Sequence, residues 1–168
     1  MTPRLESLPE IEAAVWRELE RATHDKHHGW RTTVLATVDG DAADARTVIL
    51  REVDARQKQL LVFTDDRAGK VGQLLRHPRA TLVMWSPQLS WQLRCKAHLS
   101  LDATGLAATS RWARIKLTPA AQDYLARLPP GAPLGPAPGD APPGAPPGPL
   151  GREYFAVVSA KVSAIDWL

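Results

Sequence analysis

The sequence predicts a mainly β fold with added helices, a six-stranded antiparallel β-barrel formed by a single domain over residues 1–168. Six segments have strand character, most of them follow one another through short polar turns, and helical segments lie at the start and between strands. Strands joined in this way pair antiparallel, and closure into a barrel leaves no sheet edge exposed. A chain of this length can bury one sizeable core but not two.

The first helix is predicted over residues 7–25. Ser7 and Glu10 have the separation of a capping box, in which each side chain accepts a hydrogen bond from the backbone N–H of the other. Apolar residues recur every fourth position, at Ile11, Val15 and Leu19. An amphipathic helix is therefore expected to pack against the barrel.

The strands and the remaining helices follow in order along the chain. Residues 30–40 run as a strand into Asp39-Gly40, a strong hairpin signal, and the partner strand is predicted from Arg46 to Val53. A short helix is expected to start near Asp65 or Asp66 and to stop before Pro78. Further strands are predicted at 60–64, 80–85, 89–101 and 153–168, and helical segments at 105–117 and 118–128, where Thr118 is the expected cap.

A proline- and glycine-rich segment, at about residues 129–151, interrupts this pattern. It holds ten of the 15 prolines of the chain and lacks the periodicity of a core-forming element. A long surface loop with local polyproline character is expected, and a PxxP ligand for an SH3-type domain is the alternative.

The composition is typical of a globular protein, with 44% hydrophobic and 23% charged residues. The net charge of +3 suits an anionic small molecule, but the basic residues are too dispersed for nucleic acid. No segment resembles a secretion signal or reaches the roughly 18 apolar residues of a membrane span. The single cysteine, Cys95, fits a reducing compartment, so a cytoplasmic protein is expected.

The segment RTVILREVD begins with an arginine beside the core-forming residues of a strand. Side chains alternate between the two faces of a strand, so Arg46 shares a face with Val48 and Leu50. A guanidinium at the rim of an apolar face can bind a phosphate or a carboxylate through paired hydrogen bonds. The alternative is a surface ion pair with Asp44 or Glu52.

A second cation, Lys70, follows in the segment FTDDRAGKV. It is expected in the first turns of a helix, where free backbone N–H groups attract anions and a lysine adds charge. Asp65 and Asp66 oppose a phosphate here unless one of them caps the helix, which is the favoured interpretation. A Mg²⁺ site made from both carboxylates is the alternative, and no metal site is expected.

A third candidate is Gln92, in the segment SWQLRCK. Its side chain is oriented opposite to those of Trp91 and Leu93. An inward-facing amide can donate to and accept from a heterocycle such as a flavin or a base. Exposure to solvent is the alternative, and alternation alone does not decide between them.

Three segments occur in a characteristic order: RTVILREVD, LLVFTDDRAGKVGQLLRHPRATLVMW and WQLRCKA. Together they resemble the flavin-binding split barrel of the pyridoxamine 5′-phosphate oxidase family. The chain is most similar to the oxidase-related branch of FMN-binding proteins, whose substrates are mostly unassigned. The similarity covers residues 10–100 and, more loosely, the last strand.

This resemblance implies a homodimer that holds FMN at the subunit interface. It places Arg46 and Lys70 on the FMN phosphate, and Arg67 is a possible further phosphate ligand. A run along the flavin ring and ribityl chain is implied for Thr47, Val48, Ile49 and Leu50.

The same resemblance assigns four more residues. Phe63 and Thr64 match an aromatic–threonine pair next to the cofactor, and Gln92 matches a glutamine that contacts the isoalloxazine ring. Arg51 stands where the oxidases keep a lysine that reaches the substrate phosphate. No residue is expected to act as a nucleophile.

The chain departs from the family pattern in two places. Ala68-Gly69-Lys70 replaces the Ser-Arg-Lys that family members often have at the helix start, so one guanidinium is missing and Arg67 is its substitute. The oxidases also use a C-terminal hairpin for flavin and substrate, whereas this chain stops at Leu168, and the proline-rich segment occupies the substrate-recognition region. FMN binding is therefore expected, and oxidation of pyridoxamine phosphate is not.

The expected function is that of an FMN-dependent oxidoreductase acting on an unidentified small molecule. A non-catalytic flavin- or haem-binding carrier or sensor of the same fold is the first alternative. A barrel that binds single-stranded nucleic acid through Trp91 is the second, and the dispersed basic residues disfavour it.

Other conspicuous residues have structural explanations. A metal site is conceivable at three neighbouring histidines, His24, His27 and His28. However, Gly29 predicts that the helix ends before they can share one face. Cys95 is expected to be an inert core thiol. Two tryptophans are expected in the barrel wall or the dimer face, Trp85 and Trp91.

Overall fold

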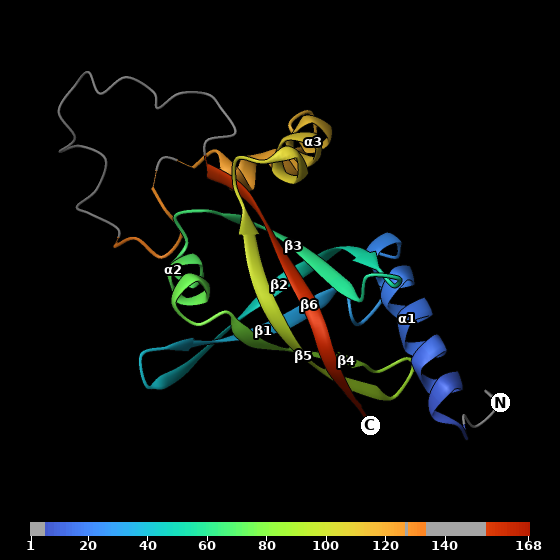
Figure 1. Cartoon of the computed structure of the whole chain (residues 1–168). Helices are drawn as coiled ribbons and strands as arrows, with labels where there is room; N and C mark the ends of the chain where they lie inside the picture. The colour runs from blue at the N-terminus through green and yellow to red at the C-terminus, as the bar shows by residue number, and fades with distance from the viewer. Residues whose placement is uncertain (1–5, 127, 134–153) are drawn as a thin grey trace, which may run out of the picture.

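The described residues form a closed barrel of six antiparallel strands in the order β1-β2-β3-β6-β5-β4 (Figure 1). A computed structural model describes residues 6–126, 128–133 and 154–168. The strands are β1 (Thr32–Asp39), β2 (Ala42–Asp54), β3 (Gln59–Asp65), β4 (Arg79–Ser86), β5 (Trp91–Asp102) and β6 (Phe155–Trp167). The predicted six-stranded antiparallel barrel is confirmed.

The C-terminal strand completes the barrel. β6 pairs with β3 on one side and with β5 on the other, and β1 pairs with β4 where Val34 lies opposite Val83. Each of these strands therefore has a neighbour on both sides, which removes the long unpaired edges that favour aggregation.

The hairpin between β1 and β2 forms where the sequence predicts it. Asp39 and Ala42 are paired and enclose a two-residue turn. The first turn residue, Gly40, has φ of 64°, a left-handed conformation that glycine adopts readily. β2 begins at Ala42, earlier than the predicted Arg46.

Alternate residues of the strands fill the barrel interior. In β2 the inward residues Val48 and Leu50 are buried, whereas Thr47 is exposed, so the predicted alternation is confirmed. Cys95 of β5 is completely buried, and burial raises the pKa of its thiol to about 12. Such a thiol stays protonated, as expected of a core cysteine.

Among the described residues, four helical segments lie around the barrel: α1 (Leu8–His24), α2 (Gly69–Arg76), α3 (Leu106–Ile115) and the 3₁₀ helix η1 (Pro119–Tyr124) (Figure 1). α1 starts with the predicted capping box and contacts β2, while α2 lies near β1 and β5. α3 and η1 contact β6 and β3, respectively. They cover a second apolar cluster outside the main core: Leu61, Ala108, Tyr124, Phe155 and Val157.

One predicted helix start is wrong. α2 begins at Gly69 with Ala68 as its cap residue, so neither Asp65 nor Asp66 caps it; Asp65 is instead the last residue of β3. The segment expected to form a helix at 118–128 starts where predicted, with Thr118 at the cap position and Pro119 in the first turn, but it is a six-residue 3₁₀ helix and the Thr118 side chain makes no capping bond.

Most of the proline-rich segment lies outside the described residues, which resume at Tyr154. Within the described part of the chain, no helix is long and apolar enough to cross a membrane.

Candidate functional site

The guanidinium of Arg46 lies between β2 and α2 in a hydrogen-bond network. Its Nη1 donates to Thr37 Oγ1 at 2.6 Å and to the Leu35 carbonyl at 3.1 Å. Its Nη2 donates to the Asp44 carboxylate at 2.5 Å and to Gln73 Oε1 at 2.8 Å. The ion pair with Asp44, considered from the sequence as the alternative to phosphate binding, is therefore present.

The network also links the partners of Arg46 to one another. The Gln73 amide donates to the Asp44 carboxylate at 2.8 Å, and the Thr37 hydroxyl donates to Gln73 Oε1 at 2.6 Å. Gln73 and Thr37 are buried, so these bonds satisfy polar groups that solvent does not reach. Donation by Gln73, and then the charge of Arg46, lowers the pKa of Asp44.

Sequence reasoning did not assign Gln73 or Thr37 a role. Two signals were available: Thr37 has the strand orientation of the buried Leu35, and Gln73 lies three residues after Lys70, on the same side of a helix. An uncharged polar residue at a core-facing position is an indication of a buried network.

Lys70, the second residue of α2, lies close enough to Arg46 for their charges to interact. Burial, and then the charge of Arg46, lowers the pKa of Lys70, while Asp65 acts in the opposite direction. Among the described residues Lys70 has neither a hydrogen bond nor an ion pair. Two cations distant in sequence thus converge, and within the described part of the chain one of them has no ion pair.

A phosphate dianion fits this pair of cations. It would supply the counter-ion that Lys70 lacks and would accept charge-assisted hydrogen bonds from Arg46. The Asp44 carboxylate accepts a hydrogen bond from Arg46 Nη2. Its side chain is 48% exposed, so it can rotate toward solvent and leave that nitrogen to a phosphate. The residues present are therefore suited to a phosphorylated cofactor.

The guanidinium of Arg67 already contacts Asp65 and Tyr154. Its Nε and Nη2 donate to the two carboxylate oxygens of Asp65 at 3.0 and 2.6 Å, and its Cζ lies 3.4 Å from the centre of the Tyr154 ring. The hydrogen bond with Asp65 raises the pKa of Arg67. Arg67 connects the end of β3 to the start of β6, and a phosphate would have to compete with Asp65 for it.

The run from Thr47 to Arg51 divides between the two faces of β2. Val48 and Leu50 point into the core. The side chains of Thr47, Ile49 and Arg51 lie on the outer face, where a ligand would reach only them and the backbone.

Phe63 and Thr64, predicted as a pair beside the cofactor, lie on opposite faces of β3. Phe63 packs against the second apolar cluster outside the main core. The guanidinium carbon of Arg51 is 5.7 Å from the centre of the Phe63 ring. Thr64 is buried, and its hydroxyl donates to the Asp65 carbonyl at 3.1 Å. Burial raises the pKa of Tyr124, whose hydroxyl also interacts with Arg51.

Gln92 lies away from Arg46 on the barrel surface. In the ladders, Arg46 is opposite Leu35, and Leu35 is opposite Leu82, whereas Gln92 is opposite Trp85. Leu82 and Trp85 are three residues apart, or about 10 Å along a strand, in addition to the spacing across three strands. The half-buried Gln92 side chain faces outward beside Trp85, so one chain alone does not bring it to Arg46.

The outer surface near Gln92 carries an apolar patch formed by Val34, Ile49, Val83 and Trp85. Val34 and Val83 are direct partners between β1 and β4, and Trp85 follows two residues later on the same face. Trp85 is 54% exposed and Val34 36% exposed. We call these four residues the outer patch; clustered apolar side chains of this kind often mark a protein–protein interface.

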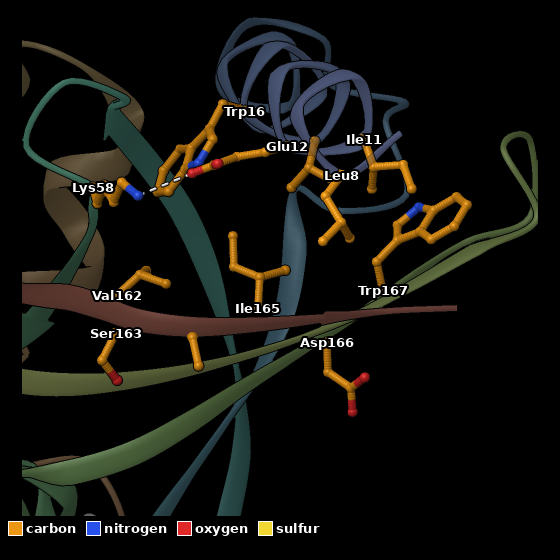
Figure 2. A pocket seen from close by; sticks show the side chains of 12 residues that line it. Leu8, Ile11, Glu12, Trp16, Lys58, Val162, Ser163, Ile165, Asp166 and Trp167 are labelled. Carbon is orange, nitrogen blue, oxygen red and sulfur yellow. Dashed lines mark hydrogen bonds and ion pairs between the residues drawn. The ribbon is translucent and has the colours of Figure 1, made fainter. Parts of the chain in front are cut away.

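A separate cavity of 490 Å³ lies between α1 and the end of β6 (Figure 2). Figure 2 shows Trp16 and Ile165 lining it, with the Lys58 ammonium 2.9 Å from the Glu12 carboxylate at one side. None of the predicted cofactor residues lines this cavity, and its lysine already has a counter-ion.

The structure supports no metal site among the described residues, where no group of three or more His, Cys, Asp or Glu side chains is arranged to hold an ion. α1 ends at His24, and His28 is instead bonded to Glu18 at 3.1 Å and to the Trp30 backbone N–H. Burial, and then the neighbouring Asp65, raises the pKa of Asp66.

Comparison with known proteins identifies relatives of this fold and site. A curated pyridoxine/pyridoxamine 5′-phosphate oxidase from Thermosynechococcus vestitus is 41% identical over 66 residues, which is 39% of this chain and only 30% of that enzyme. The solved structure of a pyridoxamine 5′-phosphate oxidase-related, FMN-binding protein from Nostoc punctiforme PCC 73102 has a TM-score of 0.68 and 25% identity, covering 97% of this chain and 86% of the other.

A more distant structure shares the fold. General stress protein 26 from Bacillus anthracis Sterne has a TM-score of 0.57 at 15% identity, covering 92% of this chain and 93% of its own. The family model described as pyridoxamine 5′-phosphate oxidase, FMN-binding domain, matches residues 13–101, more than half of the chain. The chain therefore belongs to the pyridoxamine 5′-phosphate oxidase-like family of FMN-binding domains.

Proposed function

We propose that this chain binds FMN and that Arg46 and Lys70 hold its phosphate. The observation that carries the proposal is the convergence of these two cations, one of them without a counter-ion among the described residues. A half-buried lysine beside an arginine is costly unless an anion is bound, and a phosphate monoester supplies two negative charges. Membership of an FMN-binding family supports this choice of anion.

The flavin ring is proposed to lie along the outer face of β2. The backbone from Thr47 to Leu50 and the outward side chains of Thr47 and Ile49 face that side. Phe63 would contact the ring from β3, whereas the buried Thr64 would act through its backbone. Arg67 would contribute positive potential near the phosphate while it remains bonded to Asp65.

A homodimer is proposed to complete the site. Gln92 lies three strand spacings from Arg46 and about 10 Å further along the strands, and it lies beside the outer patch. If two chains pair through the outer patch, each Gln92 can reach the cofactor held by the partner. Burial of Trp85 and Val34 in that interface would supply apolar contact area of the kind found at interface centres.

We further propose that the holoprotein is an oxidoreductase with an unidentified small-molecule substrate. The chemistry supplied by such a cofactor is the exchange of a hydride or of electrons at the flavin N5. The chain would contribute binding, orientation and charge. Arg51, half-buried beside Phe63, is placed to attract an anionic group of a substrate near the ring.

The first test is to purify the protein, record its absorption in the visible range, and identify the released cofactor by mass. FMN at about one molecule per chain supports the proposal, and a colourless protein that does not take up added FMN contradicts it. Anaerobic reduction by NAD(P)H or a candidate amine, followed by reoxidation in air, then tests for turnover. A flavin that is inert to every donor favours a carrier or sensor.

A further inference from the structure

A groove of 570 Å³ lies on the outside of the barrel where β1 and β4 separate. The pairing between these strands ends at Ala36 and Thr81, although β1 continues to Asp39 and β4 starts at Arg79. Alanines line much of the groove: Ala36, Ala43, Ala80 and Ala97. These short side chains leave both space and apolar surface.

The charge of the groove is unbalanced. Arg79, Lys96 and His98 line it, and no aspartate or glutamate does. All three are exposed, and within the part of the chain that the structure describes none of them forms an ion pair. The cavity between α1 and β6, by contrast, contains two carboxylates and one lysine.

The strand register brings these basic side chains together. Arg79 is directly opposite His98 across β4 and β5, and Lys161 is opposite His98 on the β6 side. Lys96 faces Thr81 two residues further along the same ladder. Directly opposite side chains have Cβ atoms about 5 Å apart, so Arg79, His98 and Lys161 form one row of basic side chains across three strands. The Lys161 ammonium donates to the Gln57 carbonyl.

We propose that this groove is a second anion-binding site, which takes a phosphomonoester or similar dianion with a small apolar body. Arg79 and Lys96 supply charge-assisted hydrogen bonds, and the Thr81 hydroxyl lies between them. The alanine-lined floor accommodates the apolar body, in the manner of pockets that combine apolar walls with a few polar groups. Neither Arg46 nor Lys70 lines the groove, but Thr37, which accepts a hydrogen bond from Arg46, does, so the test keeps FMN in excess to occupy the first site.

The test is a titration of the isotope-labelled full chain with phenyl phosphate, with FMN present in excess, followed by amide chemical shifts. Saturable shifts are expected at residues 79–81 and 96–98, and phenol should cause none. Arg79→Gln with Lys96→Gln should weaken binding about tenfold or more, because two charged donors are lost. The matched pair Lys26→Gln with Lys116→Gln removes the same charge elsewhere and should leave the affinity unchanged.

Three results would overturn the proposal: shifts confined to the surroundings of Arg46 and Lys70, shifts that do not saturate, or equal weakening by the matched pair. Inorganic phosphate serves as a second compound, and binding as tight as that of phenyl phosphate would contradict the role of the alanine floor. The shift map of the unmodified chain decides the location even if the double variant fails to fold.

Discussion

The α2 end of the barrel and the outer patch differ in how many of the proposed cofactor contacts a single chain supplies. At the α2 end, Arg46 is held by buried partners from β1 and α2, and only an anion for Lys70 is missing. On the outer patch, Trp85 is more than half exposed, and Gln92 lies beside it, three strand spacings from Arg46. One chain therefore supplies the proposed phosphate contacts and the ring contacts from β2 and β3, whereas the proposed Gln92 contact comes from a second chain.

This difference separates two free-energy contributions that a bound flavin would combine. The phosphate contribution depends on charges fixed by a rigid polar network, so it should persist in a monomer. The contribution of Gln92 to ring binding depends on association through apolar surface and should be lost with the dimer. The predictions below act on one region at a time.

The largest effect is expected from Arg46→Ala combined with Lys70→Ala. Loss of two charge-assisted phosphate contacts should weaken FMN binding by about 100-fold or more, measured by equilibrium dialysis. Arg76→Ala with Lys26→Ala removes the same charge from exposed positions and should have little effect. Since Lys70 has no partner among the described residues, the single variant Lys70→Ala should remain folded and still bind FMN more weakly.

The next effect concerns the outer patch, through Trp85→Lys. A charge in the middle of an apolar interface should weaken dimerisation by about 30-fold or more, seen by sedimentation equilibrium. Leu117→Lys, at a residue that is 87% exposed, is the matched control. A Trp85→Lys protein that remains dimeric at micromolar concentration would rule out the outer patch as the interface.

A smaller effect is expected from Asp44→Asn at the α2 end. The Asp44 carboxylate competes with a phosphate for the Arg46 fork, so removing its charge should tighten FMN binding about threefold to tenfold. Isothermal titration calorimetry measures the change, and Asp41→Asn in the adjacent turn is the control. Weaker binding would instead mean that Asp44 chiefly positions Arg46.

The smallest effect is on stability, through Lys70→Met in the cofactor-free protein. Burial and Arg46 keep the folded-state pKa of Lys70 below the ordinary value of 10.5, so the unfolded chain binds more protons between the two pKa values. The charged lysine therefore costs stability at neutral pH, and the wild type regains it as pH rises through that window. Lys70→Met should raise the free energy of unfolding at pH 7 by a few tenths of a kcal/mol, after allowance for solvent screening.

Urea denaturation at pH 7 and near pH 10.5 checks this sign. The stability difference between Lys70→Met and wild type should shrink at the higher pH. Arg76→Met, at the exposed end of the same helix, should show no such pH dependence, and a Lys70→Met variant that is less stable at pH 7 would contradict the electrostatic explanation.

The strands and the orientation of Arg46 were predictable from the sequence because they follow from local alternation. The hairpin at Gly40 and the first helix have turn and capping signals of their own. The start of α2 was mispredicted, because Asp65 satisfies its carboxylate by binding Arg67 rather than by capping a helix. That choice depends on Tyr154, which is distant in sequence and packs on Arg67.

The predicted site was recovered only in part, for a geometric reason. The sequence suggested that Arg46 and Lys70 act together, and the structure brings them close because α2 packs across the end of β1. Gln73 and Thr37 were not predicted, since a buried network depends on three elements meeting at one point. Alternation left the orientation of Gln92 open, and only the register with Trp85 places it on the outer surface.

The most direct measurement compares the affinities of FMN and riboflavin for the wild-type chain and for the Arg46→Ala, Lys70→Ala variant. The two ligands differ only in the phosphate, so their ratio isolates what these cations contribute. We predict that the wild type prefers FMN by about 100-fold or more and that the variant binds both ligands about equally. An undiminished preference for FMN in the variant would contradict the account.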